Sequence, residues 1–432
     1  MRYRIALSLA LAGCAMAGQL PAQEPPLSLA DAEKIAIQNH PRVLAAENEA
    51  GAAGKLVIEA KSAYLPQLSA DITGSQASQE ARIGAGTLPA SSLWTRFGQG
   101  VVFSQLITDS GRTTNLVANS KLQAQASQED SRATRYSVIL DVNRAYYEVL
   151  RAQAVLKVAQ ETAAARQTLY AQVDTLAKNK LRSQLDVSFA SVSLSQAKLM
   201  VIRAEAAIDG AYAELARALG EQQVVRYKLV DEPLPPKPPD QPGDLVAQAL
   251  ANRPELAGAR LSSGAAHKLE QAEKDLRYPT VSIVGVAGFL PLINEESHGR
   301  ISPAYEGAAV NVDIPIFNGH RFAARREAAR YQALAADQRV REWQQQIARD
   351  VRTVWSESRT AFERLGVTAQ MVKQAGLGLD LAQGRYNLGL SSIVELTQAQ
   401  LSVTQAQIED LSARYDYQSQ YAALQYAMGL LR

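Results

Sequence analysis

The 432-residue sequence has little of what enzymes and nucleic-acid-binding proteins usually have. It contains one cysteine, four histidines and only 6% aromatic residues. A single cysteine excludes an intramolecular disulfide. The 45 basic and 43 acidic residues nearly cancel to a net charge of +2, which gives no reason to expect nucleic acid as a partner. The low aromatic content, set against abundant alanine and glutamine, favours long helices over a compact catalytic core.

Signatures of catalysis and of metal binding are also missing. The four histidines, at positions 40, 267, 298 and 320, share no ligand spacing. The sequence has no G-x-S-x-G motif, no phosphate-binding loop and no G-x-G-x-x-G motif after a predicted strand. Asn39-His40-Pro41 is interpreted as the end of a helix. We therefore expect no enzyme activity, no metal and no cofactor.

The N-terminus, residues 1–22, has the pattern of an export signal. Two arginines precede an apolar run and then small residues, which predicts cleavage near Ala17 or Ala22 and transfer out of the cytoplasm. The stretch LAGC, ending at Cys14, also resembles the lipobox of bacterial lipoproteins, in which the cysteine is acylated. Cys14 is therefore a candidate lipidation site; the alternative is a small apolar residue inside an ordinary signal.

Beyond this signal, no apolar run reaches the roughly 18 to 20 residues that a membrane helix needs. If the mature chain crosses a membrane, we expect it to do so as a closed β-barrel, in which every backbone polar group is paired.

The rest of the sequence contains an internal duplication. Asn39 and Pro41 recur 213 positions later as Asn252 and Pro254. Other pairs at this offset are Gly51 with Gly264, Lys61 with Lys274, Pro66 with Pro279 and Ser69 with Ser282. From residue 317 to the end the offset is 209, as for Gly220 and Gly429, so one loop of the second copy is four residues shorter. A proline-rich segment, residues 231–243, is expected to be an extended linker between repeat 1 (27–230) and repeat 2 (244–432).

Each repeat predicts the same order of elements. Each repeat begins with a short helix. In repeat 1 it begins at Ser28, where Asp31 completes a capping box, and in repeat 2 it begins at Asp244, which we expect to be the N-cap. A second helix runs to Pro66 or Pro279. Two alternating strands of about ten residues follow, a length that suits a tilted membrane strand. The predicted strands span residues 66–75, 95–107, 279–289 and 305–317.

A long helix follows the strands in each repeat, over about 111–178 and 319–386. Nearly 70 helical residues would reach about 100 Å. Apolar residues recur at coiled-coil spacing. They are Ile139, Val142, Tyr146, Val149 and Leu156 in the first helix and Val351, Trp355, Phe362 and Leu365 in the second. The chain then turns, and an antiparallel helix rich in glutamine and alanine returns.

The stretch VDIPIFNGHR, residues 312–321, first looks like a hairpin turn, because Asn-Gly follows alternating apolar residues. A helical sequence follows instead of a second strand. We interpret the stretch as the passage from a strand into the long helix, in which Pro315 ends the strand pairing and Asn318-Gly319 supplies the bend. The stretch FSQLITDSGR has the same role 209 residues earlier.

Several motifs, in this order and present twice, resemble the outer-membrane efflux protein family, the TolC family. They are NHPRV and NRPEL in the first helices, YLPQL and RYPTV before the strands, SQLITDSGR and DIPIFNGHR at the passages, and GLSSIVELTQAQLSVTQAQ at the second hairpin. The resemblance covers essentially the whole mature chain. It implies a mainly helical homotrimer with membrane β-strands. Four strands per chain would close a 12-stranded barrel in outer-membrane lipid, and a coiled-coil tunnel would continue it across the periplasm.

The resemblance also implies a function and partners. The chain would be the outer-membrane channel of an efflux or type I secretion system, docked on a periplasmic adaptor protein and, through it, on an inner-membrane pump of the RND or ABC type. Drug, metal and protein cargo all remain open. The alternative is a periplasmic coiled-coil scaffold without a channel, against which the duplicated strand pairs argue.

Candidate site residues follow from the resemblance. The family carries two acidic residues three positions apart just after the second turn, which form rings in a pore constriction; here they match Glu395 and Gln398, so one acid is replaced by an amide. Asp186 is equivalent to Glu395 at the offset of 209. Rings of carboxylates would favour cations and raise some pKa values; the alternative is that both acids stabilise the first turn of a helix. The adaptor-contacting tip matches Leu388, Gly389 and Leu390, with Leu181 in repeat 1; for Gly389 the alternative is a tight turn.

Overall fold

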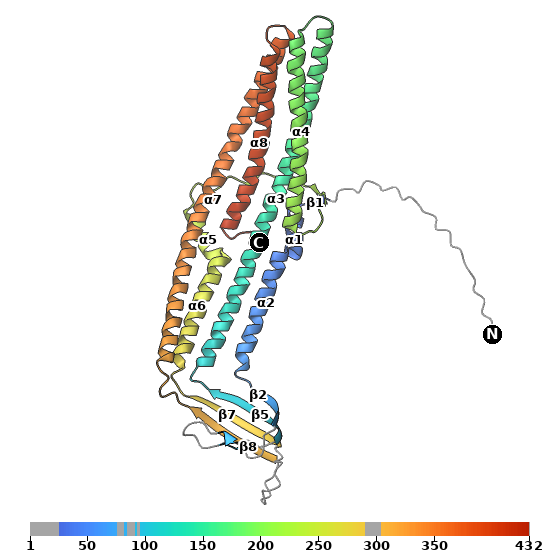
Figure 1. The fold of residues 1–432 in the computed structure, drawn as a ribbon. Helices are drawn as coiled ribbons and strands as arrows, with labels where there is room; N and C mark the ends of the chain where they lie inside the picture. The colour runs from blue at the N-terminus through green and yellow to red at the C-terminus, as the bar shows by residue number, and fades with distance from the viewer. Residues whose placement is uncertain (1–25, 76–81, 84–90, 93–95, 290–303, 432) are drawn as a thin grey trace, which may run out of the picture.

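The computed structural model describes residues 26–75, 82–83, 91–92, 96–289 and 304–431. The predicted export signal and Cys14 lie outside the described residues. The molecule is elongated (Figure 1). A β-sheet lies at one end, helices run along the long axis, and two helical hairpin tips lie at the other end.

Both repeats contain the same principal elements in the same order. Repeat 1 contains α1 (Leu29–Asn39), α2 (Pro41–Ser62), β2 (Gln67–Ser75), β5 (Arg96–Thr108), α3 (Arg112–Lys178) and α4 (Gln184–Leu219). Repeat 2 contains α5 (Gly243–Asn252), α6 (Pro254–Asp275), β7 (Thr280–Phe289), β8 (Ala304–Asp313), α7 (Arg321–Asn387) and α8 (Ile393–Ala427). The minor strands are β1 (Pro26–Leu27) paired with β6 (Lys228–Leu229), and β3 (Arg82–Ile83) paired with β4 (Ser91–Ser92).

The predicted duplication is confirmed in the bounds of the helices. α2 and α6 both contain 22 residues and begin at prolines 213 positions apart, whereas α3 and α7 both contain 67 residues and begin 209 positions apart. Two details of the prediction are wrong. The second helix of each repeat ends four residues before its proline, at Ser62 and Asp275. Asp244 is not an N-cap, because α5 already begins at Gly243 and Asp244 lies in its first turn.

The apolar stripe predicted on the first long helix forms the main core. Ile139, Val142, Tyr146 and Val149 are all fully buried. Most of them pack with α1 and α4 in one hydrophobic cluster that also contains Leu215 and Leu219. A second cluster joins α5, α7 and α8 in the same way. The long helices are therefore stabilised by tertiary packing along their middle, where the short helices and the hairpins overlap (Figure 1).

The proline-rich segment has no helix or strand between residues 230 and 242, and repeat 2 holds it in place. The indole Nε1 of Trp355 donates to the carbonyl of Pro239 at 2.8 Å, and the hydroxyl of Tyr417 donates to the carbonyl of Pro236 at 2.5 Å. The amide of Gln418 donates to the carbonyl of Glu232 at 2.8 Å. The segment has no regular secondary structure, and specific hydrogen bonds tie it to α7 and α8.

The four long strands form one antiparallel sheet in the order β2-β5-β7-β8. The two repeats meet at the β5–β7 pair, and β2 and β8 each have one neighbour and one free edge. The prediction that β8 reaches residue 317 is wrong, because the strand ends at Asp313, opposite Thr280. The equivalent end of β5 pairs with β7, but β8 is an edge strand and its following residues have no strand beside them.

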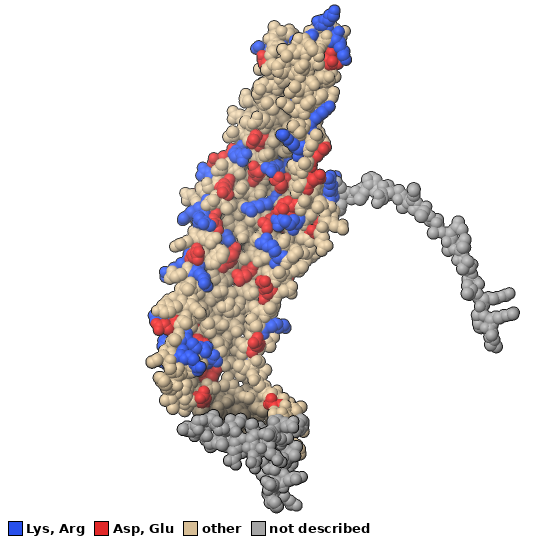
Figure 2. All heavy atoms as spheres, viewed as in Figure 1, with Lys and Arg blue, Asp and Glu red and all other residues tan. Residues whose placement is uncertain are grey.

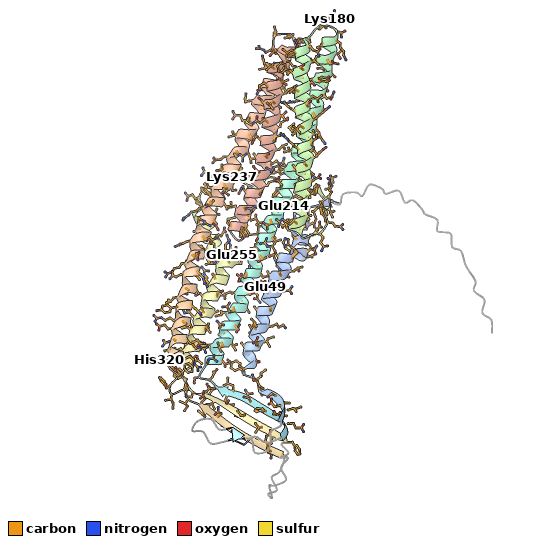
Figure 3. The ribbon with its side chains drawn as sticks, viewed as in Figure 1. Glu49, Lys180, Glu214, Lys237, Glu255 and His320 are labelled. Atoms are coloured by element: carbon orange, nitrogen blue, oxygen red, sulfur yellow. The ribbon has the colours of Figure 1, made fainter. Side chains whose placement is uncertain are left out.

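Each strand enters its long helix through two consecutive left-handed residues, Ser110 and Gly111 in repeat 1 and Gly319 and His320 in repeat 2. The carboxylate of Asp109 then accepts hydrogen bonds from the backbone N–H of Thr113 at 2.7 Å and from its hydroxyl at 2.6 Å. The predicted bend is therefore confirmed, one residue later than Asn318-Gly319. Figure 3 places His320 at this joint.

One described helix, α4, is long and apolar enough to cross a membrane by length and composition alone, with a mean hydropathy of 1.3 over its best window. The expectation that no segment passes this test is therefore wrong. Only 28% of that window is buried within the protomer. Its exposed apolar side chains include Leu185, Phe189, Val192, Leu199 and Ile202. On the face shown in Figure 2, charged residues gather over the middle of the helices and at the extreme tip, and the segment between them is largely uncharged.

The C-terminal ends of α4 and α8 fix where the hairpins meet the short helices. Gly220 and Gly429, 209 positions apart, have φ values of +77° and +71°. A Cβ at Gly220 would lie 2.7 Å from the Cα of His40, and a Cβ at Gly429 would lie 3.0 Å from the carbonyl carbon of Asn252. These contacts explain why the terminal glycine recurs together with the Asn-x-Pro sequences.

We expect Gly220→Ala to lower the stability by about 2–3 kcal/mol, because the left-handed conformation and the backbone contact both disfavour a side chain. Gly210→Ala is the matched control: Gly210 lies inside α4 with nothing within 4 Å, so alanine there should be neutral or stabilising by up to about 1 kcal/mol. Thermal unfolding of the purified proteins in detergent measures the difference. Equal melting temperatures for the two variants would contradict the expectation.

Candidate functional site: the paired hairpin tips

The turns α3–α4 and α7–α8 lie side by side at the end of the molecule opposite the sheet (Figure 1). A hydrophobic cluster with members from all four helices joins them. Its buried members are Leu169, Val173, Val187, Ala190, Ala382, Tyr386, Ile393 and Leu396. The two tips of one protomer therefore form a single packed unit.

Both turns have the same backbone geometry. Lys180 and Gly389, 209 positions apart, are left-handed with φ values of 62° and 74°. The N–H of Leu181 donates to the carbonyl of Leu176, and the N–H of Leu390 donates to the carbonyl of Arg385, as expected for a Schellman C-cap. In repeat 1, Lys180 therefore adopts the left-handed conformation that glycine adopts in repeat 2; Figure 3 labels Lys180 at the tip.

The three leucines predicted to contact the adaptor are among the most exposed apolar side chains at this end. Leu388 is 76% exposed, Leu181 69% and Leu390 68%. Apolar exposure continues along α4 at Leu185 and Phe189. The tip therefore exposes apolar side chains among the charged residues that Figure 2 shows at this end.

One polar contact joins the first turn directly to the second hairpin. The guanidinium of Arg182 donates to the carbonyl of Tyr386 at 2.9 Å and lies 4.4 Å from the centre of its ring. Burial raises the pKa of the Tyr386 phenol, and the charge of Arg182 partly opposes this rise. The residue equivalent to Arg182 in repeat 2, at the offset of 209, is Ser391. Because serine cannot make this contact, the repeat pattern in the sequence does not predict it.

The predicted constriction residues have different surroundings. Asp186 is part of a capping box: its N–H donates to the hydroxyl of Ser183, and its carboxylate accepts from the N–H of Ser183, both at 3.2 Å. Glu395 also follows a serine cap, Ser392, but its carboxylate pairs with Arg385 at 3.2 Å. For both acids, the alternative to a pore role was that they stabilise the first turn of a helix. The side chain of Asp186 has this capping role.

Gln398 lies one helical turn after Glu395, and both residues are exposed in the protomer. Side chains three apart on a helix lie on the same face. The two residues assigned to the constriction thus share a solvent-facing side of α8.

The described residues show no catalytic or metal-binding constellation at the tips. No group of three His, Cys, Asp or Glu residues in the described part of the chain could hold a metal ion. Ser263, His267 and Asp337 do meet between α6 and α7, far along the helices from the tips. Ser263 and His267 both contact the Asp337 carboxylate, at 2.5 and 3.2 Å, so the serine and histidine share an acceptor and do not form a proton relay.

Comparisons with known proteins agree on one family. The profile described as Outer membrane efflux protein matches residues 34–221 and again residues 245–430. Outer membrane efflux protein BepC from Brucella suis is 25% identical over 417 residues, covering 95% of this chain and 87% of the relative. Outer membrane protein TolC from Vibrio cholerae is 24% identical over 410 residues, covering 94% and 91%.

Solved structures show the same fold. The outer membrane protein VceC from Vibrio cholerae superimposes with a TM-score of 0.75 and 19% identity, covering 93% of this chain and 96% of that one. The open state of the MtrE outer membrane channel from Neisseria gonorrhoeae gives a TM-score of 0.75 and 19% identity, with 94% and 90% covered.

Proposed function

Because this chain belongs to the outer membrane efflux protein family, we propose that it forms the outer-membrane channel of an efflux or type I secretion system. The observation that carries the proposal is that both halves match the family separately, with one fold along nearly the whole chain. The family is one of transport channels rather than enzymes, and its place is the outer membrane. A periplasmic scaffold without a channel does not account for the membrane-length strands.

The functional unit in this proposal is a homotrimer. One protomer supplies four strands whose sheet has free edges at β2 and β8. Unpaired strand edges cannot face lipid, because their N–H and C=O groups would lack partners. Three copies joined edge to edge would close 12 strands into a barrel, and the helices would continue its wall.

The purified full-length protein in a planar lipid bilayer tests this function. We expect discrete ion conductance from a species that native mass measurement identifies as a trimer. A monomeric protein that gives no conductance would contradict the proposal.

The partners in this proposal are a periplasmic adaptor protein at the tips and, through it, an inner-membrane pump of the RND or ABC type. The exposure of Leu181, Leu388 and Leu390 supports the adaptor assignment, since exposed leucines grouped at the end of a helical bundle favour a protein partner.

The pore constriction is assigned to Glu395, Gln398 and Asp186. Charge-only variants separate this role from capping. We expect Glu395→Gln to reduce the preference for cations and to raise conductance by about twofold, since a ring of three carboxylates is neutralised. Asp186→Asn should act in the same direction while an amide oxygen keeps the hydrogen bond to the N–H of Ser183. The reversal potential under a salt gradient measures both.

Ser183→Ala is the matched control for these variants. It removes the cap of α4 and leaves all charges in place, so it should lower thermal stability by about 1 kcal/mol without changing ion selectivity. Unaltered selectivity in both Glu395→Gln and Asp186→Asn would remove the constriction assignment.

A further inference from the structure

The joint between α1 and α2 in repeat 1 is built around a buried histidine. His40 ends α1, is the N-cap of α2 and is only 6% exposed. Its ring Nδ1 accepts a hydrogen bond from the backbone N–H of Arg42 at 3.1 Å. Its Cα lies in the close contact with Gly220, the residue that follows α4. His40 therefore holds the start of α2 and the end of the first hairpin at one point.

The hydrogen bond from Arg42 defines the protonation state of this ring. An imidazole nitrogen accepts a hydrogen bond only while it carries no proton, so the ring of His40 is neutral, with its proton on Nε2. A proton on Nδ1 would turn the acceptor into a donor. The first turn of α2 would then lose its side-chain cap.

The charges that face the ring also disfavour a proton on it. They are Arg42 from α2, Arg217 from α4 and Asp141 from α3. Asp141 is paired with Arg42 at 3.1 Å, and Arg217 is paired with Glu214 at 2.5 Å. Burial lowers the pKa of His40 below its ordinary value of 6.5, the two arginines lower it further, and Asp141 opposes them.

The equivalent joint of repeat 2 is built around a cation. Adding 213 to positions 40 and 42 gives Arg253 and Glu255, and adding 209 to position 217 gives Tyr426. The guanidinium of Arg253 donates to the Glu255 carboxylate at 2.7 and 3.0 Å and lies 5.1 Å from the centre of the Tyr426 ring. Figure 3 labels Glu255 at this joint.

The two joints share one backbone conformation but differ in charge. His40 has φ −69° and ψ 124°, and Arg253 has φ −67° and ψ 120°. The same position thus holds a permanent positive charge beside a carboxylate and an aromatic ring in repeat 2. In repeat 1 it holds a titratable ring beside two arginines.

We propose that the α1–α2 joint of repeat 1 is a pH-sensitive switch. At neutral pH the uncharged ring of His40 caps α2 and packs at the end of α4. In acid the ring gains a proton, the cap is lost, and His40 becomes a third cation beside Arg42 and Arg217. The first turn of α2 and the last turn of α4 then loosen, whereas the α5–α6 joint stays closed because Arg253 is charged throughout.

The direction of this effect follows from the two states of the chain. The unfolded chain takes up a proton at His40 near pH 6.5, whereas the folded joint takes it up only at lower pH. The contribution of the neutral ring to stability is therefore complete above pH 6.5 and is lost as the pH falls to the lower pKa of the folded joint. Acid weakens this joint.

Hydrogen–deuterium exchange of the purified full-length protein at pH 7.5 and pH 5 tests the switch, with each rate divided by the intrinsic rate at that pH. We expect protection in residues 42–46 and 216–221 to fall at least about fivefold at pH 5, the factor that loss of an ordinary helix cap gives. The equivalent residues of repeat 2, 255–259 and 425–430, serve as an internal control and should change by less than about twofold.

Two variants identify the titrating group. His40→Asn keeps a side-chain cap but cannot gain a proton in this range, so the loss of protection in acid should disappear. His267→Asn is the matched control. His267 lies on α6, where its ring contacts Asp337 at 3.2 Å, and its replacement should leave the fivefold loss at residues 42–46 in place.

Three results would overturn the switch. They are equal protection of residues 42–46 at both pH values, an equal loss of protection in both repeats, and an undiminished loss in His40→Asn. The exchange measurements need neither a membrane nor a partner protein. They therefore decide the switch whether or not the chain conducts ions.

Discussion

The Arg182→Ala variant is expected to pass more current than the wild-type channel. Arg182 joins the two hairpin tips of a protomer through its hydrogen bond to the Tyr386 carbonyl and its position over the Tyr386 ring. Losing both contacts removes about 2 kcal/mol of tip-to-tip interaction in each protomer. That loss corresponds to about a 30-fold change in the ratio of joined to separated tips. Bilayer conductance and the entry of a large antibiotic into cells measure the result.

Two controls identify the contact as the cause. Arg182→Lys keeps the charge but loses the planar guanidinium, so it should lie between wild type and Arg182→Ala. Lys178→Ala removes an exposed cation at the end of α3, four residues before Arg182; its ion pair with Asp174 stays within α3, so this variant should conduct like wild type. Equal conductance of Arg182→Ala and Lys178→Ala would show that the contact does not hold the tips together.

The long helices were predictable from the sequence for a physical reason. Apolar residues recur at helical spacing over 67 residues, and the second copy repeats the pattern at a fixed offset. The predicted bounds, 111–178 and 319–386, lie within two residues of Arg112–Lys178 and Arg321–Asn387. A pattern repeated over many turns leaves little freedom in where a helix begins and ends.

Features that depend on a neighbour were not predictable in the same way. The sequence from Tyr305 to Phe317 alternates like a strand, but pairing stops at Asp313, where the adjacent strand begins. The contact of Arg182 with Tyr386 joins residues 204 positions apart that have no counterpart in the other repeat. Asp186 shows a third case, because a capping acid and a pore acid look identical in the sequence. The side-chain hydrogen bond to Ser183 shows the first role and leaves the second to experiment.

Tyr146→Phe is expected to be among the most destabilising conservative changes in the helical region. The ring is fully buried in α3, and the hydroxyl oxygen accepts from the N–H of Val230 at 2.9 Å. The O–H of Tyr146 has two carbonyl acceptors within reach, that of Val230 at 2.7 Å and that of Leu27 at 2.9 Å. The side chain thus fixes both the first described residues and the start of the proline-rich segment. Phenylalanine would leave the carbonyl of Val230 without its donor, whereas the Val230 N–H still donates to the carbonyl of Leu27 at 3.2 Å; we expect a cost of about 1–3 kcal/mol at neutral pH.

The pH dependence of this difference identifies the hydroxyl as its source. Burial raises the pKa of Tyr146 from about 10 to about 12 in the folded protein. The folded state therefore keeps its proton where the unfolded state has lost it, so the hydroxyl's contribution is complete below pH 10 and falls as the pH rises through 12. The deficit of Tyr146→Phe should shrink by up to about 2–3 kcal/mol across that window. Tyr227 and Tyr417, whose pKa values burial also raises to about 12 without a contribution from Tyr146, titrate in both proteins and cancel in the difference.

Unfolding of wild type and variant in detergent at pH 8, 10 and 12 measures this change. Tyr170→Phe is the matched control, because Tyr170 lies in the same helix and its hydroxyl makes no hydrogen bond within the described residues. That variant should stay within about 0.5 kcal/mol of wild type at every pH. If Tyr146→Phe is less stable than wild type by the same amount from pH 8 to 12, the loss of stability comes from packing and not from the hydroxyl. The backbone of Val230 would then be held by the β1–β6 pair rather than by the phenol.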